Sequence, residues 1–197
     1  MAVKYHVAAA KCLYTSFAEE VYETIRRLSA NLDTSWDQLE RAKTVLVKFN
    51  DVYWKDKIEL YDGKYFQSLV DLRTMRAVLQ LLRERTKAHL MVMDTSLIPL
   101  GQDYESDVFF RDILDEYGAE FVNASLDQPV WYDVPGGGTI FGRYLLHPRV
   151  AEADAVVSVA KMKCHGGTGI TMCMKNLFGL LPVEPYGKES KEVFHAH

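Results

Sequence analysis

The chain has 197 residues, of which 48% are hydrophobic and 25% are charged, and its formal net charge is −4 at pH 7. This composition is that of a folded globular protein and excludes a disordered one. A mildly acidic chain lacks the strongly basic balance of nucleic-acid-binding proteins, so we expect no nucleic-acid partner. No window reaches the about eighteen uninterrupted apolar residues of a membrane span, and the first residues do not form a signal peptide. We therefore expect a cytoplasmic protein with no membrane partner.

Three cysteines are present, Cys12, Cys164 and Cys173, without a C-x-x-C pair. They are too few for the usual thiolate set of an iron–sulfur cluster. The sequence therefore predicts no iron–sulfur cluster on this chain alone and no metal ligand set, and it leaves any other cofactor unknown.

The first half of the chain alternates helical and strand patterns. Apolar residues at helical spacing predict a helix over residues 16–29, with Ser16 as its N-cap. A short β-branched run predicts a buried strand over 44–50, and the run over 89–94 predicts a second buried strand. Between these strands, residues 71–87 carry one apolar helix face.

The second half continues the alternation. Its expected elements are a helix over 107–117, a strand over 119–125, an irregular Gly/Pro-rich segment around a loop at 135–138, a strand over 155–163 and a helix over 170–180. Gly118 directly follows the first of these helices and suits a left-handed C-cap.

This order of elements predicts an α/β fold, with a mostly parallel sheet flanked by helices on both faces. We expect one domain made of a helical N-terminal segment, a sheet core and a C-terminal tail, over residues 1–42, 43–182 and 183–197. Ligands of such sheets bind beyond the carboxyl ends of the strands. The polar residues at those ends, Asn50, Asp94 and Lys163 among them, are therefore the first candidates for a site.

Several of these segments resemble a known family. The runs VLVKFN, MVMDTS, EADAVVSVAKMKCH and GITMCMKNLFGLLP are similar to the domain of unknown function 362 family. The resemblance covers roughly residues 43–182 and includes a strand that ends in Lys-x-Asn, here Lys48 and Asn50. The family hallmark, K-x-K-x-H and then T-x-x-x-K-N-x-F-G, is matched by Lys161, Lys163, His165, Thr171, Lys175, Asn176, Phe178 and Gly179.

The resemblance implies association with ferredoxin-like iron–sulfur modules, so an iron–sulfur protein is an expected partner. Two departures stand out: Cys164 replaces the usual threonine, and family members usually continue with further strands beyond the K-N-x-F-G helix. We therefore expect an incomplete or compact family domain. The apolar surface left open after Leu180 and Leu181 would then be covered by a partner, and a homo-oligomer is one way to do so.

The hallmark also has a direct physical interpretation. Alternate residues of an extended chain share one face, so Lys161, Lys163 and His165 would lie together. The glycines that follow allow a tight turn with exposed amides, and a helix starting near residues 168–170 would add its own free amides. Such a cluster predicts a site for a small carboxylate or phosphate. The residues expected to bind this ligand are Lys48, Asn50, Asp94, Lys161, Gly166, Gly167, Thr168, Gly169, Thr171, Lys175 and Asn176.

Two functions remain open. The first is an enzyme acting on a small anionic metabolite, with His165 as acid/base and Lys163 as a second catalytic residue. The second is a non-catalytic binding or assembly module that docks a partner or a cofactor through the same basic pocket. Asp94 could orient His165, bind a metal or cap the next element. We interpret Met162, Met172 and Met174 as core residues and Cys173 as a buried thiol.

Overall fold

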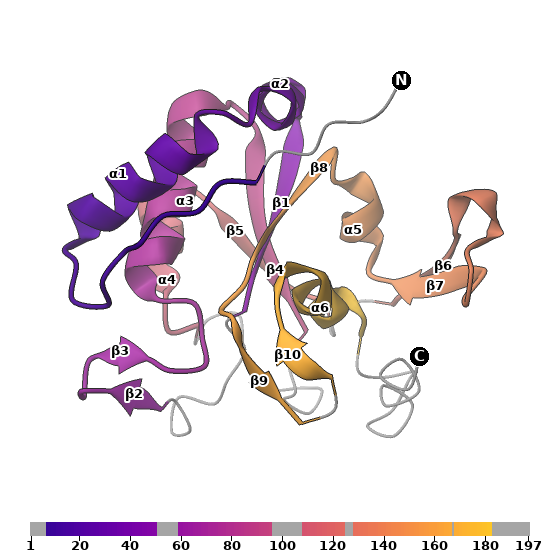
Figure 1. Cartoon of the computed structure of the whole chain (residues 1–197). Helices are drawn as coiled ribbons and strands as arrows, with labels where there is room; N and C mark the ends of the chain where they lie inside the picture. The colour runs from indigo at the N-terminus through magenta and orange to yellow at the C-terminus, as the bar shows by residue number, and fades with distance from the viewer. Residues whose placement is uncertain (1–6, 51–58, 96–107, 125–127, 167, 183–197) are drawn as a thin grey trace.

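The protein is built around a sheet of four parallel strands in the order β5–β4–β1–β8 (Figure 1). A computed structural model describes residues 7–50, 59–95, 108–124, 128–166 and 168–182. The sheet strands are β1 (Thr44–Phe49), β4 (His89–Asp94), β5 (Glu120–Asn123) and β8 (Ala155–Val159). Strand β1 pairs in parallel with both β4 and β8, and Val47 lies opposite Val92 and Val157. The expected α/β fold is confirmed, and the strands end at one common edge.

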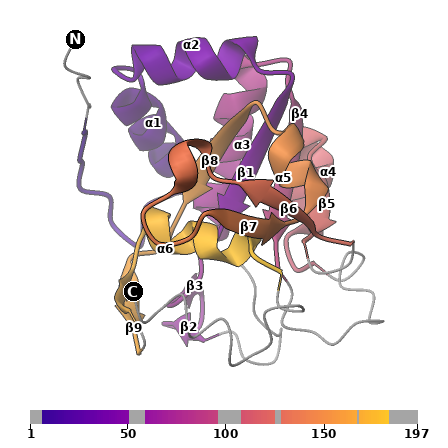
Figure 2. The ribbon, with the colours of Figure 1, turned by 90° about the vertical axis from the view of Figure 1, so that its right-hand side faces the viewer.

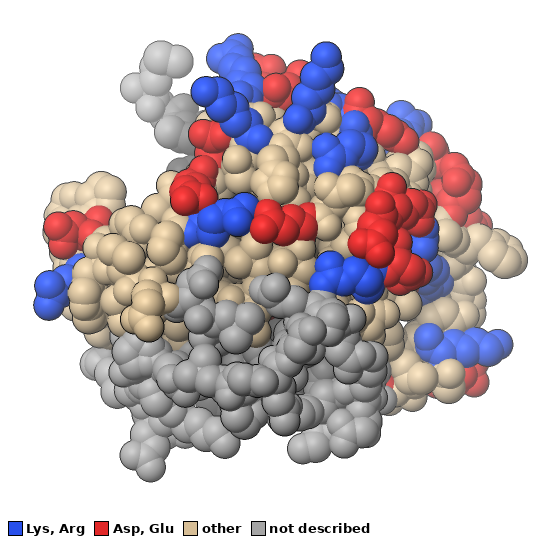
Figure 3. Space-filling view, turned by 180° about the vertical axis from the view of Figure 1, so that it is seen from behind, with Lys and Arg blue, Asp and Glu red and all other residues tan. Residues whose placement is uncertain are grey.

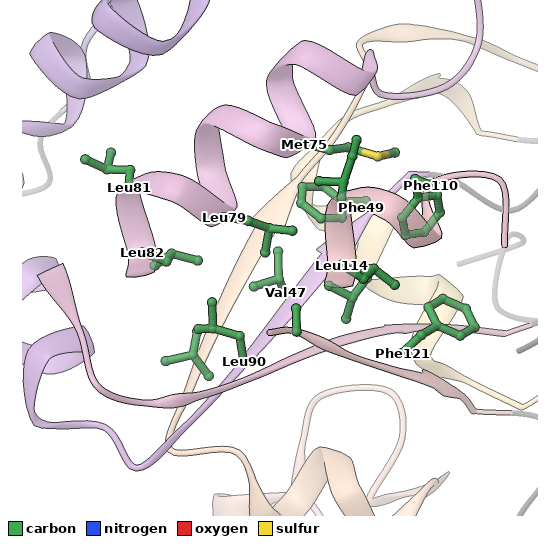
Figure 4. Close-up of a cluster of buried hydrophobic side chains, with 14 of the residues drawn as sticks. Val47, Phe49, Met75, Leu79, Leu81, Leu82, Leu90, Phe110, Leu114 and Phe121 are labelled. Carbon is green, nitrogen blue, oxygen red and sulfur yellow. The ribbon is translucent and has the colours of Figure 1, made fainter. Parts of the chain in front are cut away.

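Four helices cover the first face of the sheet. They are α1 (Ala18–Ser29), α2 (Asp33–Arg41), α3 (Leu72–Arg85) and α4 (Arg111–Tyr117). Alternate residues of β1, Val47 and Phe49, point into the core beneath them, against Leu79 of α3 and Leu114 of α4 (Figure 4). Because side chains of a strand alternate between faces, the residues between them must lie on the other side of the sheet.

Shorter elements cover the second face, α5 (Pro148–Glu152), α6 (Cys173–Leu177) and the 3-10 turn η3 (Phe178–Leu180) (Figure 2). A smaller core lies here, in which Leu46 of β1 and Met91 of β4 pack with Leu180 of η3. Helices therefore flank both faces, as expected. Lys48 belongs to the same alternation as Leu46, so strand periodicity directs it to this second face.

The fourth strand is shorter than the sequence predicted. It ends at Val159, and the following residues enter a separate antiparallel hairpin made of β9 (Lys163–His165) and β10 (Gly169–Thr171). The physical reason is loss of a partner, because Val159 is paired with Phe49, the last residue of β1. The expected helix over 170–180 is wrong at its start, since α6 begins only at Cys173 and gives way to η3.

A second hairpin replaces the irregular segment that we expected. Strands β6 (Val130–Asp133) and β7 (Arg143–Leu146) pair in antiparallel fashion, and the glycine-rich loop forms the 3-10 turn η2 (Pro135–Gly137) between them. The Arg143 guanidinium lies 4.4 Å from the ring centre of Trp131 across the hairpin. Such cross-strand pairs stabilise short strands whose apolar pattern is weak. The short hairpin of β2 (Leu60–Tyr61) and β3 (Tyr65–Phe66) was likewise not predicted.

Helix ends agree with the sequence in part. Gly118 closes α4 in the left-handed region, at φ 57°, as expected. The N-cap of α1 is Phe17 and not Ser16, because the Glu20 carboxylate accepts a hydrogen bond from the Phe17 amide at 2.8 Å. Acidic and basic side chains are interspersed over the upper part of the face seen from behind (Figure 3). None of the helices in the described ranges combines the length and apolar character needed to cross a membrane.

Candidate functional site

A buried ion pair lies at the carboxyl edge of the sheet. Lys48, only 1% exposed, donates from Nζ to Asp94 Oδ2 at 2.5 Å and to the carbonyl oxygen of Phe49. Its third acceptor is Asn176 Oδ1, at 3.3 Å. A buried ammonium requires such partners, because leaving water uncompensated costs several kcal/mol per ion. Three residues assigned to the site from sequence, Lys48, Asp94 and Asn176, are therefore brought together.

Asn176 connects helix α6 to the two neighbouring strands. Its Nδ2 group donates to the carbonyl oxygen of Lys48 at 2.8 Å and lies within hydrogen-bonding distance of Ser158 Oγ and the Val159 carbonyl, at 3.2 and 3.3 Å. The Ser158 hydroxyl in turn donates to the carbonyl of Cys173, at 2.9 Å. These contacts fix the start of α6 over the ends of β1 and β8, and Ser158 is a positioning residue that we did not identify from sequence.

The backbone at Gly179 packs directly against the Lys48–Asp94 ion pair. Its carbonyl accepts a hydrogen bond from the Thr95 amide at 2.9 Å, and the same amide lies 2.7 Å from Asp94 Oδ1. A Cβ atom on Gly179 would come within 2.6 Å of both Asp94 Oδ1 and Lys48 Cε. Only glycine therefore lets the η3 backbone approach this closely, which explains the final glycine of the K-N-x-F-G run.

Two further lysines lie near this pair, each half-buried. Lys163 of β9 donates from Nζ to the carbonyl oxygen of Ser68 at 2.7 Å, and the Lys175 ammonium of α6 lies 4.8 Å from the ring centre of Phe178. Burial lowers the pKa of Lys163, and the positive charges of Lys175 and Lys48 lower it further, against an opposing effect of Asp94. Burial and Lys48 likewise lower the pKa of Lys175. The charged forms of the Lys163 and Lys175 amines are therefore less favoured than that of an exposed lysine.

Two buried oxygen atoms have no hydrogen-bond partner within the described structure, Thr171 Oγ1 in β10 and Asn50 Oδ1 directly after β1. Thr171 is only 3% exposed, and it is the direct cross-strand partner of Lys163 in the β9–β10 hairpin. A buried polar atom left unpaired costs about 1–3 kcal/mol. Both residues were assigned to the site from sequence, and both have an oxygen atom with unused hydrogen-bonding capacity.

The glycine-rich turn leads into a strand and not directly into a helix. His165 Nδ1 accepts a hydrogen bond from the Thr168 amide at 3.2 Å, and Gly169 adopts φ 71° at the start of β10. The turn therefore joins two strands, and its amides do not merge with a helix N-terminus as expected. Gly166 is exposed at this turn, and Gly167 lies outside the described residues.

Burial alternates along the segment that leads into the hairpin. Lys161, Lys163 and His165 are half-buried, whereas Met162 and Cys164 between them are exposed. This is the pattern expected of an extended segment with one face toward the protein. The assigned role of His165 as acid/base and that of Lys161 as a ligand stay predictions.

The apolar and sulfur-containing side chains of this region are more exposed than expected. Met162 is 69% exposed, Met172 51% and Met174 89%, so their interpretation as core residues is wrong. The thiol of Cys173 is also exposed, not buried. The reason is the late start of α6, which places residues 172–174 at its exposed first turn instead of mid-helix. Within the described ranges, no group of three or more His, Cys, Asp and Glu side chains is arranged to hold a metal ion.

Comparison with known proteins adds the family. The family model described as "Domain of unknown function (DUF362)" matches residues 45–197, which is more than half of the chain. The chain belongs to this family, as the resemblance of its sequence indicated. No curated protein and no solved structure gives a significant match.

Proposed function

We propose that this protein binds a small carboxylate or phosphate anion at the carboxyl edge of its sheet, between Lys163 and Lys175. One observation carries the proposal. Of the described charged groups that act on the Lys163 amine, Lys48 and Lys175 are cations and Asp94 is the single anion. Asp94 is already bound to Lys48, at 2.5 Å. An anion placed between the two remaining ammonium groups relieves their repulsion.

The hydrogen-bonding groups support the same ligand class. The Thr171 hydroxyl can donate to an anionic oxygen, and it has no other partner among the described residues. Asn50 Oδ1 can accept a hydrogen bond from a hydroxyl group on the same ligand. A lysine ammonium presents three donors, so Lys163 can keep its bond to Ser68 and still bind the anion.

A second candidate function is a docking module, which the expected iron–sulfur protein partner would fit. The observation that favours it is the exposure of Met162, Ile170, Met172 and Met174 on the hairpin and at the start of α6. Apolar side chains gathered on a surface are typical of protein–protein contacts. Small-ligand binding is favoured here, because Lys163 and Lys175 are half-buried and the polar groups around them are deeply buried.

The proposed site is tested by anion titration with thermal unfolding as the readout. Sulfate, phosphate and malonate should each raise the melting temperature above that in sodium chloride of equal ionic strength, because they bind the folded state. Lys163→Ala and Lys175→Met should each weaken binding by about 1.5–3 kcal/mol, the range for hydrogen bonds to charged groups. Lys87→Met, at an exposed lysine after α3, is the matched control and should respond like the wild type.

The proposal fails if no anion raises the melting temperature of the wild type. It also fails if Lys163→Ala and Lys175→Met respond to sulfate as Lys87→Met does. A docking module predicts a different pattern, in which anions have no effect and charged or polar replacements of Met172 and Met174 abolish association with a partner.

A further inference from the structure

We propose that Lys163 is a nucleophile that forms an imine with the carbonyl carbon of a small 2-oxo acid, whose carboxylate Lys175 binds. This inference rests on the proposed anion site and goes further, since it names the ligand class and a covalent step. Four features carry it: the position of Lys163, its cationic neighbours, the unpaired Thr171 hydroxyl and the exclusion of Lys48 from the same role.

The position of Lys163 suits a nucleophile. Its side chain is half-buried, and the Ser68 carbonyl holds Nζ at 2.7 Å, so the amine is fixed in place without being closed off. Fixing the amine beside a bound carbonyl compound lowers the entropic cost of the bond-forming step. Its single hydrogen bond to the described structure leaves the rest of the amine available to a ligand.

The neighbouring cations favour the reactive form of the amine. Only a neutral amine has the lone pair that attacks a carbonyl carbon, and a lysine is activated when it is desolvated next to another cation. Lys163 meets both conditions, because burial and then Lys175 and Lys48 lower its pKa. Lys175 can stay protonated and hold the carboxylate, with Phe178 against its ammonium at 4.8 Å.

Thr171 provides an independent indication of a ligand. It lies directly opposite Lys163 in the antiparallel hairpin, and opposite residues project to the same face with Cβ atoms about 4.5–5.5 Å apart. Its hydroxyl is buried and has no partner within the described structure. A 2-oxo acid whose carbonyl carbon faces Lys163 therefore meets a hydrogen-bond donor for the carbonyl oxygen.

The covalent step balances without any further reagent. The Lys163 lone pair forms the C–N bond while the carbonyl π pair moves to oxygen, which takes up a proton. The nitrogen then loses both of its protons, the hydroxyl group leaves as water with a second proton taken up, and a C=N bond remains. Amine and carbonyl compound give imine and water, with no change of oxidation state.

Lys48 does not fit this role, although it is also an amine at the site. Its Nζ atom is engaged by Asp94, Asn176 and the Phe49 carbonyl, and the side chain is only 1% exposed. The backbone of Gly179 lies against it, so that a single Cβ atom there would contact Nζ at 2.9 Å. Lys48 therefore lowers the proton affinity of its neighbours and does not react itself.

Reductive trapping of the full chain tests the inference. The protein is incubated with pyruvate and sodium cyanoborohydride, which reduces an imine to a stable secondary amine, and is then mapped by peptide mass spectrometry. We expect one dominant label, on the peptide that contains Lys163, heavier by the mass of pyruvate less one oxygen atom. Lys163→Arg should lose it, and Lys175→Met should slow labelling at least tenfold. Lys87→Arg is the control and should be labelled at Lys163 like the wild type.

The outcomes separate this inference from the anion site. If sulfate raises the melting temperature and pyruvate labels Lys163 no faster than exposed Lys64 or Lys87, the imine is wrong and the anion site stands. If neither result appears, both proposals fail. Labelling of wild-type Lys163 that sulfate suppresses supports both, and this measurement does not depend on whether any variant folds.

Discussion

At the scale of single residues, the Lys48–Asp94 pair is a buried polar feature at the carboxyl edge of the sheet. Taking both charges out of water is costly, and their attraction offsets that cost only when the remaining donors and acceptors are also bound. Lys48 meets this condition through Asn176 and the Phe49 carbonyl, and Asp94 meets it through the Thr95 amide. The pair therefore keeps two charges at fixed positions near the more accessible Lys163 and Lys175.

This account predicts strong coupling between the two residues. Lys48→Met should lower the free energy of unfolding by about 3–5 kcal/mol, because it leaves the Asp94 carboxylate buried without its counter-ion. The double variant Lys48→Met, Asp94→Leu should recover most of that loss, since replacing both partners removes both desolvation costs. Urea denaturation of the wild type, both single variants and the double variant measures the coupling. Additive effects would show that the two side chains are not paired in solution.

At the scale of elements, the site depends on how η3 closes over the sheet. Gly179 brings the backbone against the ion pair, and Asn176 attaches the preceding helix α6 to β1 and β8. The β9–β10 hairpin adds Lys163 and Thr171 from one side. Each of these elements is short, and polar contacts hold it in place together with the apolar burial of Leu180.

Glycine-to-alanine variants test this closure directly. Gly179→Ala should destabilise the protein by about 1–3 kcal/mol, the usual cost of overpacking, because its Cβ would meet Asp94 and Lys48 atoms at 2.6 Å. Gly166→Ala is the matched control, since a Cβ there meets no atom within 4 Å and should change stability by less than about 0.5 kcal/mol. Thermal unfolding of the two variants measures the effect. An equal loss of stability in both would contradict the close packing of Gly179 against the ion pair.

At the scale of the whole molecule, the electrostatics of the site make stability depend on pH. The lowered pKa of Lys163 means that the folded state binds this proton less tightly than the unfolded chain does. Between the lowered pKa and the unfolded value of about 10.4, the unfolded state carries more protons, so the free energy of unfolding rises with pH. At pH values below that window, the folded state carries the full free-energy cost of keeping the Lys163 amine charged.

The comparison with Lys163→Met isolates this effect. The difference in unfolding free energy, wild type minus variant, should increase as the pH rises through that window in the absence of anions. Saturating sulfate should flatten the dependence, because a bound anion stabilises the charged amine. Denaturation curves at intervals from neutral to alkaline pH measure it. A difference that stays constant with pH would mean that the Lys163 amine titrates alike in both states.

The sheet was predictable from sequence, whereas the closure of the site was not. The runs over 44–50 and 89–94 are mainly apolar, which is typical of strands buried on both faces, and both strands were placed correctly to within one residue. The β9–β10 hairpin lies in a run that is not mainly apolar. The point at which the chain leaves the sheet for this hairpin depends on where β1 ends. The contacts of Ser68 with Lys163 and of Gly179 with Thr95 join distant segments, so local patterns carried no signal for them.

The order of strands in the sheet also governs how the protein is made. Strand β8 is the last of the four to be synthesised, yet it pairs with β1, the first. A nascent chain that has already joined β1, β4 and β5 therefore presents β1 as an open edge, with Lys48 and Asp94 not yet covered by Asn176 and Gly179. Exposed strand edges pair with other chains, so this interval is the stage at which the growing polypeptide most needs a chaperone. Pairing of β8 closes the β1 edge, and residues 173–180, which follow β8, then cover the Lys48–Asp94 pair.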